Sequence, residues 1–369
     1  MIVKPLTEYC TLNMGQSPDS KTYNTQGNGL PFYQGNADFG ETHPVTRVWC
    51  SAPVKVAEDG DILISVRAPI GAMNMAVERC CIGRGLAALT PIRNKCSKQF
   101  LYYALQSKVD SLIAQGTGST FKAISKKVLE ATCIPSYSTI EQEQIAETIG
   151  HIDNTIAARR NQLALLDQLV KSRFIELFGD PQRNPHGYKH TKLSDIAIYY
   201  NGLTYKPENV AAEGTIVLRS SNIQNSQLDF ADTVRVDCVI KERLMVQKND
   251  ILMCSRNGSA KLVGKVALIK DMQEPMSFGA FMMIIRSHYF GYLMTYFKMD
   301  AFRQQIKTGA TTTINQITGR MLDDVTIPLP PMALVDQFVA FVEQTDKSKY
   351  YSALCIESVV SHIANQRRD

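Results

Sequence analysis

Polar and cationic side chains recur in loops directly after predicted strands. Arg67 follows the apolar run at 62–66, and Arg256 follows the run at 251–254. Guanidinium groups contact phosphate oxygens, and arginine and asparagine also form paired hydrogen bonds with base edges. Each such residue can equally be a solvated side chain or a support for its loop. With both interpretations open, the candidates for contact with a nucleic acid are Asn36, Arg67, Arg84, Thr120, Lys122, Arg219, Asn222, Arg256, Thr313 and Asn315.

The motifs of several catalytic site classes are incomplete or missing. Gly83-Arg-Gly85-Leu-Ala-Ala88 has the spacing of a dinucleotide loop, but Pro91 prevents the helix that must follow and no acidic residue appears before Asp110. His186 and His190 lie between Pro185 and Gly187, which favours a loop over a helical metal pair. The sequence has no Asn/Asp-Pro-Pro-aromatic motif and no defensible Ser/His/Asp or Cys/His arrangement. We therefore expect a noncatalytic chain that binds no metal and no cofactor of its own.

Composition limits the compartment and the class of protein. The nine cysteines are an odd number without a CxxC pair, which is typical of reduced thiols rather than of a disulfide framework or a zinc site. No apolar run approaches the ~18 to 20 residues of a membrane span, and the first residues lack a signal-peptide core. We expect a cytoplasmic protein with no membrane partner. The net charge of +5 does not by itself indicate a nucleic-acid partner.

The chain contains an internal repeat. The segment around Gly116 aligns without a gap with the segment around Gly309, an offset of 193 residues. Upstream, small insertions change the offset, and we pair Arg67 with Arg256 and Asn36 with Asn222. Self-similarity over such a length is typical of a duplicated structural unit.

Each repeat is a mixed globular stretch followed by a helical one. We predict a first globular domain, a central spacer helix, a second globular domain and a distal spacer helix at 1–138, 139–183, 184–332 and 333–369. Each globular part carries a net charge of +4, whereas the helical parts carry −2 and −1. This division is typical of globular parts that meet a polyanion and helices that meet protein.

The central helix is expected to begin with a capping box. Ser138 with Glu141, and Thr139 with Gln142, both have the required spacing. Apolar residues then recur at alternating spacings of four and three over about forty residues, or ~60 Å of helix. Such a helix needs a partner, for which 333–366 is the candidate; alternatively, each helix lies on its own domain. We predict an antiparallel coiled coil through Ile145, Ile149, Ile152, Ile156, Leu163, Leu166, Val170, Phe338, Val342, Ile356, Val359 and Ile363.

Each globular part mixes strands with helices. Continuous apolar runs predict buried strands, and a helix is expected after the last strand of each part. The predicted fold class is α+β, with two globular domains joined by two long helices in an internal pseudo-twofold repeat. The expected strands lie at 62–66, 85–89, 251–254 and 281–285, and the expected single helices at 97–114 and 289–307.

Several segments occur in an order that resembles a known family, the specificity subunits of bacterial type I restriction-modification systems. The resemblance covers nearly all 369 residues. One departure is Pro135-Ser-Tyr137, where the second half has Pro328-Leu-Pro330-Pro331, and it concerns the exit of the first domain. The segments are Gly116-Thr-Gly-Ser-Thr-Phe-Lys122, Glu141-Gln-Glu-Gln-Ile145, Phe174-Ile-Glu-Leu-Phe-Gly-Asp-Pro181 and Leu329-Pro-Pro331 with Gln337-Phe338.

The resemblance implies a recognition subunit that binds a bipartite target in double-stranded DNA. It also implies assembly with two adenine-N6 methyltransferase subunits, and with restriction subunits in the full complex. S-adenosylmethionine, ATP and Mg²⁺ would then belong to those partners. Two alternatives stay open: a stand-alone bivalent DNA-binding or scaffold protein, and the recognition component of a related two-subunit restriction enzyme.

Overall fold

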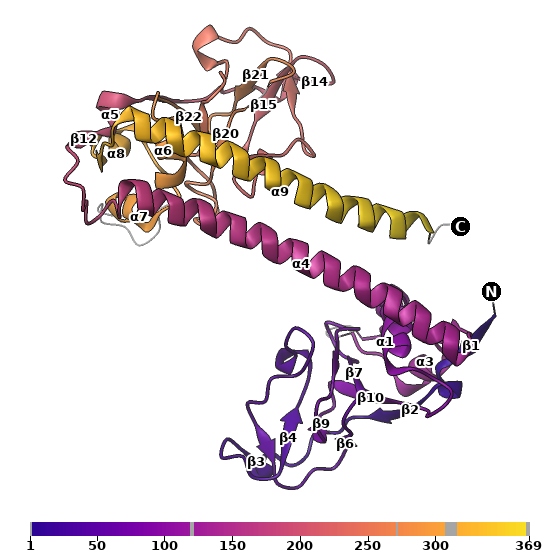
Figure 1. Cartoon of the computed structure of the whole chain (residues 1–369). Helices are drawn as coiled ribbons and strands as arrows, with labels where there is room; N and C mark the ends of the chain where they lie inside the picture. Colours follow the sequence, from indigo (N-terminus) through magenta and orange to yellow (C-terminus); the bar gives the residue numbers. More distant parts are fainter. Residues whose placement is uncertain (1, 119–121, 271, 307–315, 367–369) are drawn as a thin grey trace. The chain divides into compact units, whose positions relative to one another are not determined.

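The computed structural model describes residues 2–118, 122–270, 272–306 and 316–366, with side chains up to 358. Contacts divide the chain into two compact units, Met1–Ala157 and Ala158–Asp369, called here the first and the second unit. The boundary falls within helix α4 (Thr139–Phe178), so each unit contains one part of that helix (Figure 1). The four-part division expected from the sequence stays a prediction.

The first unit contains two main sheets and a layer of helices. An antiparallel sheet has the order β2 (Cys10–Met14), β10 (Leu86–Pro91), β7 (Ile62–Ser65), β8 (Met73–Met75). A second sheet, in which β4 and β9 are parallel, has the order β3 (Tyr23–Asn24), β5 (Trp49–Cys50), β4 (Leu30–Tyr33), β9 (Cys80–Ile82), β6 (Val56–Ala57). The remaining regular elements are β1 (Val3–Pro5), which pairs with β11 (Cys133–Pro135), and helices α1 (Lys98–Gln106), α2 (Val109–Ala114) and α3 (Lys126–Ala131).

The second unit has the same plan. Its antiparallel sheet has the order β13 (Ile198–Asn201), β22 (Met282–Arg286), β19 (Ile251–Cys254), β20 (Val266–Leu268). A second sheet, in which β15 and β21 are parallel, has the order β14 (Val210–Ala211), β18 (Arg235–Val236), β15 (Thr215–Leu218), β21 (Met276–Phe278). The other elements are the pair β12 (His190–Lys192) and β23 (Thr326–Pro328), the hairpin β16 (Ile223–Gln224) and β17 (Gln227–Leu228), and helices α5 (Leu193–Ile196), α6 (Phe290–Tyr296), α7 (Asp300–Ile306), α8 (Gly319–Asp323) and α9 (Met332–Gln366).

The mixed α+β class expected from the sequence is confirmed, and the four expected strands are present as β7, β10, β19 and β22. The inner strands β7 and β19, called here the central strands, are apolar apart from Ser65 because both of their faces are covered. In the first unit, Ile62 and Ile64 pack in the core that contains α1, while Leu63 packs in the core shared with the second sheet. In the second unit, Ile251 and Leu252 divide in the same way between two cores.

The single helices expected at 97–114 and 289–307 are wrong in detail, because each is two helices. In the first unit α1 ends at Gln106, and the hydroxyl of Ser107 donates to the carbonyl of Ala104 (2.7 Å). In the second unit α6 and α7 meet at an angle that lets Phe297 and Phe302 pack edge to face, with ring centroids 4.8 Å apart. The breaks allow both helices of each pair to bury apolar residues.

Helix α4 begins at Thr139 with one of the two expected capping boxes. The Ser138 amide and hydroxyl both donate to the Glu141 carboxylate (2.8 and 2.7 Å), and these hydrogen bonds lower the pKa of Glu141. The box of Thr139 with Gln142 was predicted wrongly. The Gln142 side chain is buried and instead donates to the carbonyls of Lys95 and Tyr137 while accepting from the amide of Ser97. It therefore ties the start of α4 to the first unit.

An aromatic cluster anchors both long helices in the second unit. Phe174 and Phe178 of α4 contact Phe338 of α9 with centroids 5.6 and 5.5 Å apart. Both also contact Tyr292 of α6, at 5.0 and 5.1 Å. All four side chains are almost fully buried, so the cluster joins the two helices to the core of the unit.

Beyond this cluster, α4 and α9 run antiparallel within the second unit. The guanidinium of Arg173 lies over the ring of Phe341, and the ammonium of Lys349 pairs with Asp167 (2.7 Å). Contacts therefore move forward along α9 as they move back along α4. Val170 packs in the same core as Phe338.

The predicted seam residues are all at least partly buried where side chains are described. Ile145, Ile149, Ile152, Ile156, Leu163, Leu166, Val342 and Ile356 are half-buried, Val170 and Phe338 are buried, and Val359 and Ile363 lie outside the described side chains. A polar stretch of α9 was not predicted from the sequence: Thr345, Lys349 and Ser352 continue the register of the seam residues Phe338 and Val342. Within the part of the chain that is described, no helix is long and apolar enough to cross a bilayer.

A buried aspartate precedes the central strand in both units, with different partners. Asp250 is fully buried, and both of its oxygens accept hydrogen bonds of 2.7 Å from the guanidinium of Arg286. The carboxylate of Asp61 accepts instead from the backbone amide of Glu58 (2.9 Å) and from the hydroxyl of Thr90. Burial raises the pKa of the Asp61 carboxyl, and the two hydrogen bonds only partly oppose this effect.

Replacing Phe338 by alanine should lower the free energy of unfolding by about 3–5 kcal/mol, because a ring within the aromatic cluster is lost. Tyr350→Ala, at a side chain 66% exposed on the same helix, should change it by less than about 0.5 kcal/mol. Urea unfolding of the full chain, followed by circular dichroism, measures both. Equal losses for the two variants would contradict the anchoring role.

The raised pKa of Asp61 predicts a pH dependence of stability. The folded chain holds the proton of Asp61 more tightly than the unfolded chain does, so the free energy of unfolding falls as pH rises from about 3.9 through the raised pKa. Asp61→Asn should remove this part of the fall, whereas Asp59→Asn at an exposed neighbour should not. Thermal unfolding between pH 4 and 8 tests it, and parallel profiles for the parent and Asp61→Asn would contradict it.

Candidate nucleic-acid interface

Three of the predicted site residues meet at one hollow of about 210 Å³ in the first unit. The hollow lies where β4 and β7 end and where the loop before β10 begins. Arg67 and Arg84 are exposed there, and Asn36 is half-buried. The full lining is Gln34, Gly35, Asn36, Ser65, Arg67, Ala68, Arg84 and Gly85.

Close backbone contacts build the hollow. The amide of Gly83 donates to the carbonyl of Tyr33 (2.8 Å), and that of Gly85 donates to the carbonyl of Gln34 (3.1 Å). A Cβ at Gly85 would lie 2.4 Å from the Gln34 carbonyl oxygen, so a larger residue would force the two segments apart. The glycines of the incomplete dinucleotide motif thus allow backbone segments to approach each other.

The hollow is cationic. Within the described part of the chain, neither Arg67 nor Arg84 forms an ion pair with a carboxylate, so their guanidinium groups stay available to a ligand. The hydroxyl of Ser65 donates to the carbonyl of Arg67 (2.9 Å) and fixes the backbone there. The amide of Ala68 donates to the carbonyl of exposed Lys122 (3.1 Å), which brings Lys122 to the same place.

Arg256 occupies the corresponding position in the second unit. It follows β19 as Arg67 follows β7, and it forms an isolated bridge with Gln316 as Arg67 does with Ala123. Its guanidinium lies over the ring of Phe281, 5.5 Å from the centroid. The two arginines therefore take the same place relative to their strands and bridges, which supports their pairing in the sequence alignment. Thr120, Thr313 and Asn315 lie outside the described residues.

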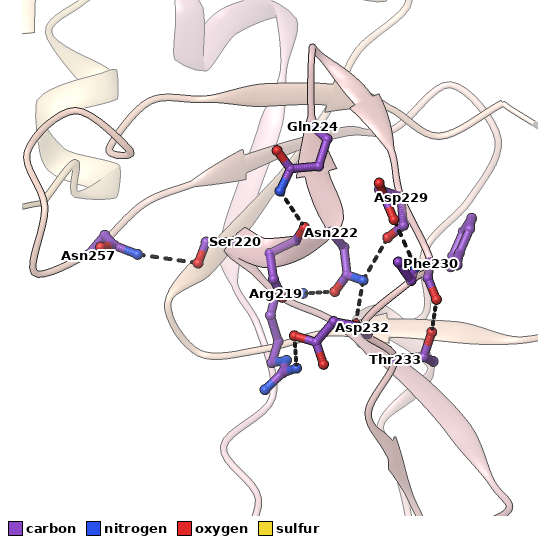
Figure 2. Close-up of polar contacts among 11 residues, drawn as sticks. Arg219, Ser220, Asn222, Gln224, Asp229, Phe230, Asp232, Thr233 and Asn257 are labelled. Atoms are coloured by element: carbon purple, nitrogen blue, oxygen red, sulfur yellow. Dashed lines mark hydrogen bonds and ion pairs between the residues drawn. The ribbon is translucent and has the colours of Figure 1, made fainter. Parts of the chain in front are cut away.

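Arg219 and Asn222 lie in the loop after β15, shown in Figure 2. The guanidinium of Arg219 pairs with Asp232 (2.7 Å). Asn222 is buried, and its amide nitrogen donates to the carbonyls of Asp229 and Asp232 (2.8 and 2.9 Å) while its oxygen accepts from the amide of Arg219 (2.8 Å). Its hydrogen bonds are used inside the loop, so Asn222 supports the shape of the loop.

The pairing of Asn36 with Asn222 was wrong. Asn222 takes the place of Asp38, whose carboxylate accepts from the amides of Gln34 and Gly35 in the same kind of turn. A residue that sequence analysis missed is Asn257, whose amide donates to the hydroxyl of Ser220 (3.2 Å) and links the loops after β19 and β15. The repeat could not reveal it, because Ala68 stands at the corresponding position.

The arrangement suits contact with a nucleic acid. Among the described residues, no group of three His, Cys, Asp or Glu side chains is placed to hold a metal ion. Exposed guanidinium groups beside amide and hydroxyl groups are the donors that contact phosphates and base edges.

Known proteins resemble this chain over different lengths. Residues 1–168 match the family model described as the type I restriction modification DNA specificity domain. The MjaX type I restriction enzyme specificity subunit of Methanocaldococcus jannaschii is 41% identical over 44% of this chain and 39% of its own length. The MjaIX specificity subunit of the same organism is 20% identical over 92% of this chain and 85% of its own length.

A solved structure extends the likeness of fold to nearly the whole chain. The type I restriction-modification S subunit of M. genitalium has a TM-score of 0.58 and 15% identity, covering 97% of this chain and 94% of that one. By contrast, the chain spans about two fifths of the MjaX subunit and of the EcoKI subunit of Escherichia coli. The comparisons confirm that this chain resembles the specificity subunits of type I restriction-modification systems and that its first 168 residues match their DNA specificity domain.

Proposed function

We propose that this chain is the DNA-recognition subunit of a type I restriction-modification complex. In each unit one exposed arginine, Arg67 or Arg256, follows the central strand of the antiparallel sheet. This recurrence is the observation that carries the proposal. Two such surfaces in one chain suit a bipartite target in double-stranded DNA, with one unit for each half-site. Each half-site would be contacted by phosphate-binding and base-reading side chains.

The two units are proposed to form a pseudo-twofold repeat joined by an antiparallel coiled coil. The shared strand order supports the duplication, and the antiparallel contacts of α4 with α9 support the helix pairing. The proposed parts are target recognition domains at 1–138 and 184–332 and spacer helices at 139–183 and 333–369. The seam residues from Ile145 to Val170 and from Phe338 to Ile363 would hold the spacer together.

The proposed DNA contacts are the cations that surround the strand ends. In the first unit they are Arg67, Arg84 and Lys122, with Asn36 at the wall of the hollow. In the second unit they are Arg219 and Arg256. Thr120, Thr313 and Asn315 stay candidates from the sequence, and Asn222 is assigned a supporting role.

The chain is proposed to be noncatalytic, with two methyltransferase subunits and restriction subunits as partners. This proposal rests on the missing catalytic motifs and on the name that its relatives carry. S-adenosylmethionine, ATP and Mg²⁺ would be bound by those partners, in the cytoplasm where the DNA lies. The test is to express the chain with and without its methyltransferase subunits and to sequence N6-methyladenine. A two-part motif that requires both components supports the proposal, and methyl transfer by the chain alone contradicts it.

Exchanging residues 1–138 for the equivalent part of a relative should change one half of the methylated motif and leave the other unchanged. The physical reason is that each unit has its own cores and its own cationic surface. Sequencing of methylated DNA measures the result. A change in both halves together would show that the units do not read separately.

Arg67→Ala and Arg256→Ala should each weaken DNA binding. A lost guanine contact costs about 1–3 kcal/mol at one base position, whereas a lost phosphate contact weakens all sequences and lowers the salt slope by about one. Arg79→Ala is the matched control, because it removes the same charge at an exposed side chain that pairs with Glu58 outside the hollow. Equal effects of Arg67→Ala and Arg79→Ala would remove Arg67 from the site.

A further inference from the structure

Strands β16 and β17 form a hairpin in the second unit. Neither the sequence motifs nor the internal repeat predicted it. Ile223 pairs with Leu228, and Gln224 pairs with Gln227. Ile223 is buried in the core between the sheets, and Leu228 packs against the same core. Because side chains alternate along a strand, the two glutamines take the opposite face, and both are exposed.

The tip of the hairpin has a fixed shape. Asn225 and Ser226 both have positive φ, 50° and 62°, as a two-residue hairpin turn requires. At the base of the hairpin, the amide of Asp229 donates to the carbonyl of Asn222 (2.9 Å). The side-chain amide of Asn222 donates in turn to the carbonyls of Asp229 and Asp232. Figure 2 shows this frame, in which Asn222 lies between the start and the end of the loop. These hydrogen bonds thus fix the base of the hairpin.

The hairpin is neutral, whereas charged side chains lie on either side of it in the sequence. Residues 220–228 contain no charged side chain. The carboxylates that follow are used inside the loop, since Asp229 accepts from the amide of Ala231 (2.8 Å) and Asp232 holds Arg219. Arg219 directly precedes residues 220–228, and Arg256 directly precedes Asn257, whose amide donates to the hydroxyl of Ser220 at the base of the hairpin (3.2 Å). Cations can hold the DNA backbone here while neutral amides reach the bases.

We propose that this hairpin enters the major groove of duplex DNA and that Gln227, helped by Gln224, reads an adenine in one half-site. The inference rests on the proposed function and names the residues that carry its specificity in the second unit. The major groove admits a two-stranded ribbon, and glutamine forms a bidentate pair with N6 and N7 of adenine. Among the described residues the Gln227 side chain makes no hydrogen bond, whereas the amide nitrogen of Gln224 donates to the Ser221 carbonyl (3.0 Å). Gln227 is therefore the principal reading residue.

The test selects bound sequences from a library of randomised DNA duplexes with the purified full chain and its variants. Gln227→Ala should lower the preference for adenine at one position of one half-site by roughly 5- to 150-fold, with the other half-site unchanged. Gln227→Glu has only acceptors and should prefer cytosine at that position, whose N4 is a donor. Ser226→Gly is the matched control, since it creates the favoured Asn-Gly turn and leaves both glutamines in place.

The outcomes separate this inference from the proposed function. A sequence preference that is the same in the parent and in Gln227→Ala overturns the reading role of the hairpin and leaves the proposed function standing. A parent chain that shows no preference for any sequence overturns both. A uniform loss of affinity in Gln227→Ala at every sequence, with a shallower salt slope, would also overturn the inference, because it is the signature of a phosphate contact.

Discussion

The constraint on which the rest of each unit depends is that its central strand is covered on both faces. Helices pack on one side of β7 and β19, and a second sheet packs on the other. Such a strand can emerge into solvent only at its ends. Its carboxyl end therefore meets the end of the parallel pair in the second sheet, and this junction is where Arg67 and Arg256 reach the surface. The place of the cationic surface is a consequence of how the cores are built.

The features that follow from local patterns could be predicted from the sequence. Continuous apolar runs located β7 and β19, and the internal repeat placed Arg67 and Arg256 at matching positions. Features that depend on tertiary partners could not be predicted in this way. Gln142 has the spacing of a capping residue but is bound by the carbonyls of another segment. Asn222 looks like an exposed loop amide and is buried as a support, because its partners lie seven and ten residues away.

The two units share one arrangement of strands but place different side chains on it. Asp61 and Asp250 stand at the same place, yet one meets a hydroxyl and the other a guanidinium. At the other end of the strand, Arg67 lies in an open hollow while Arg256 rests on an aromatic ring. The loop after the parallel strand differs most, since the second unit adds a whole hairpin there. The differences between the two units thus lie mostly in the exposed loops and strand ends, whereas the pairing of the strands is the same.

The polar stretch in the seam of α9 has a consequence for length. An apolar seam alone would tolerate sliding by one heptad, because one aliphatic contact resembles the next. The ammonium of Lys349, with its partners Asp167 and Asp346, does not. A slip would leave this half-buried charge facing apolar side chains, which is costly. Sliding of one helix along the other is therefore opposed, and a change in the paired length requires residues inserted into both helices, where one heptad adds ~10 Å, or about three base pairs of DNA. On the proposed function, this ion pair helps to keep the unread gap between the half-sites at one length.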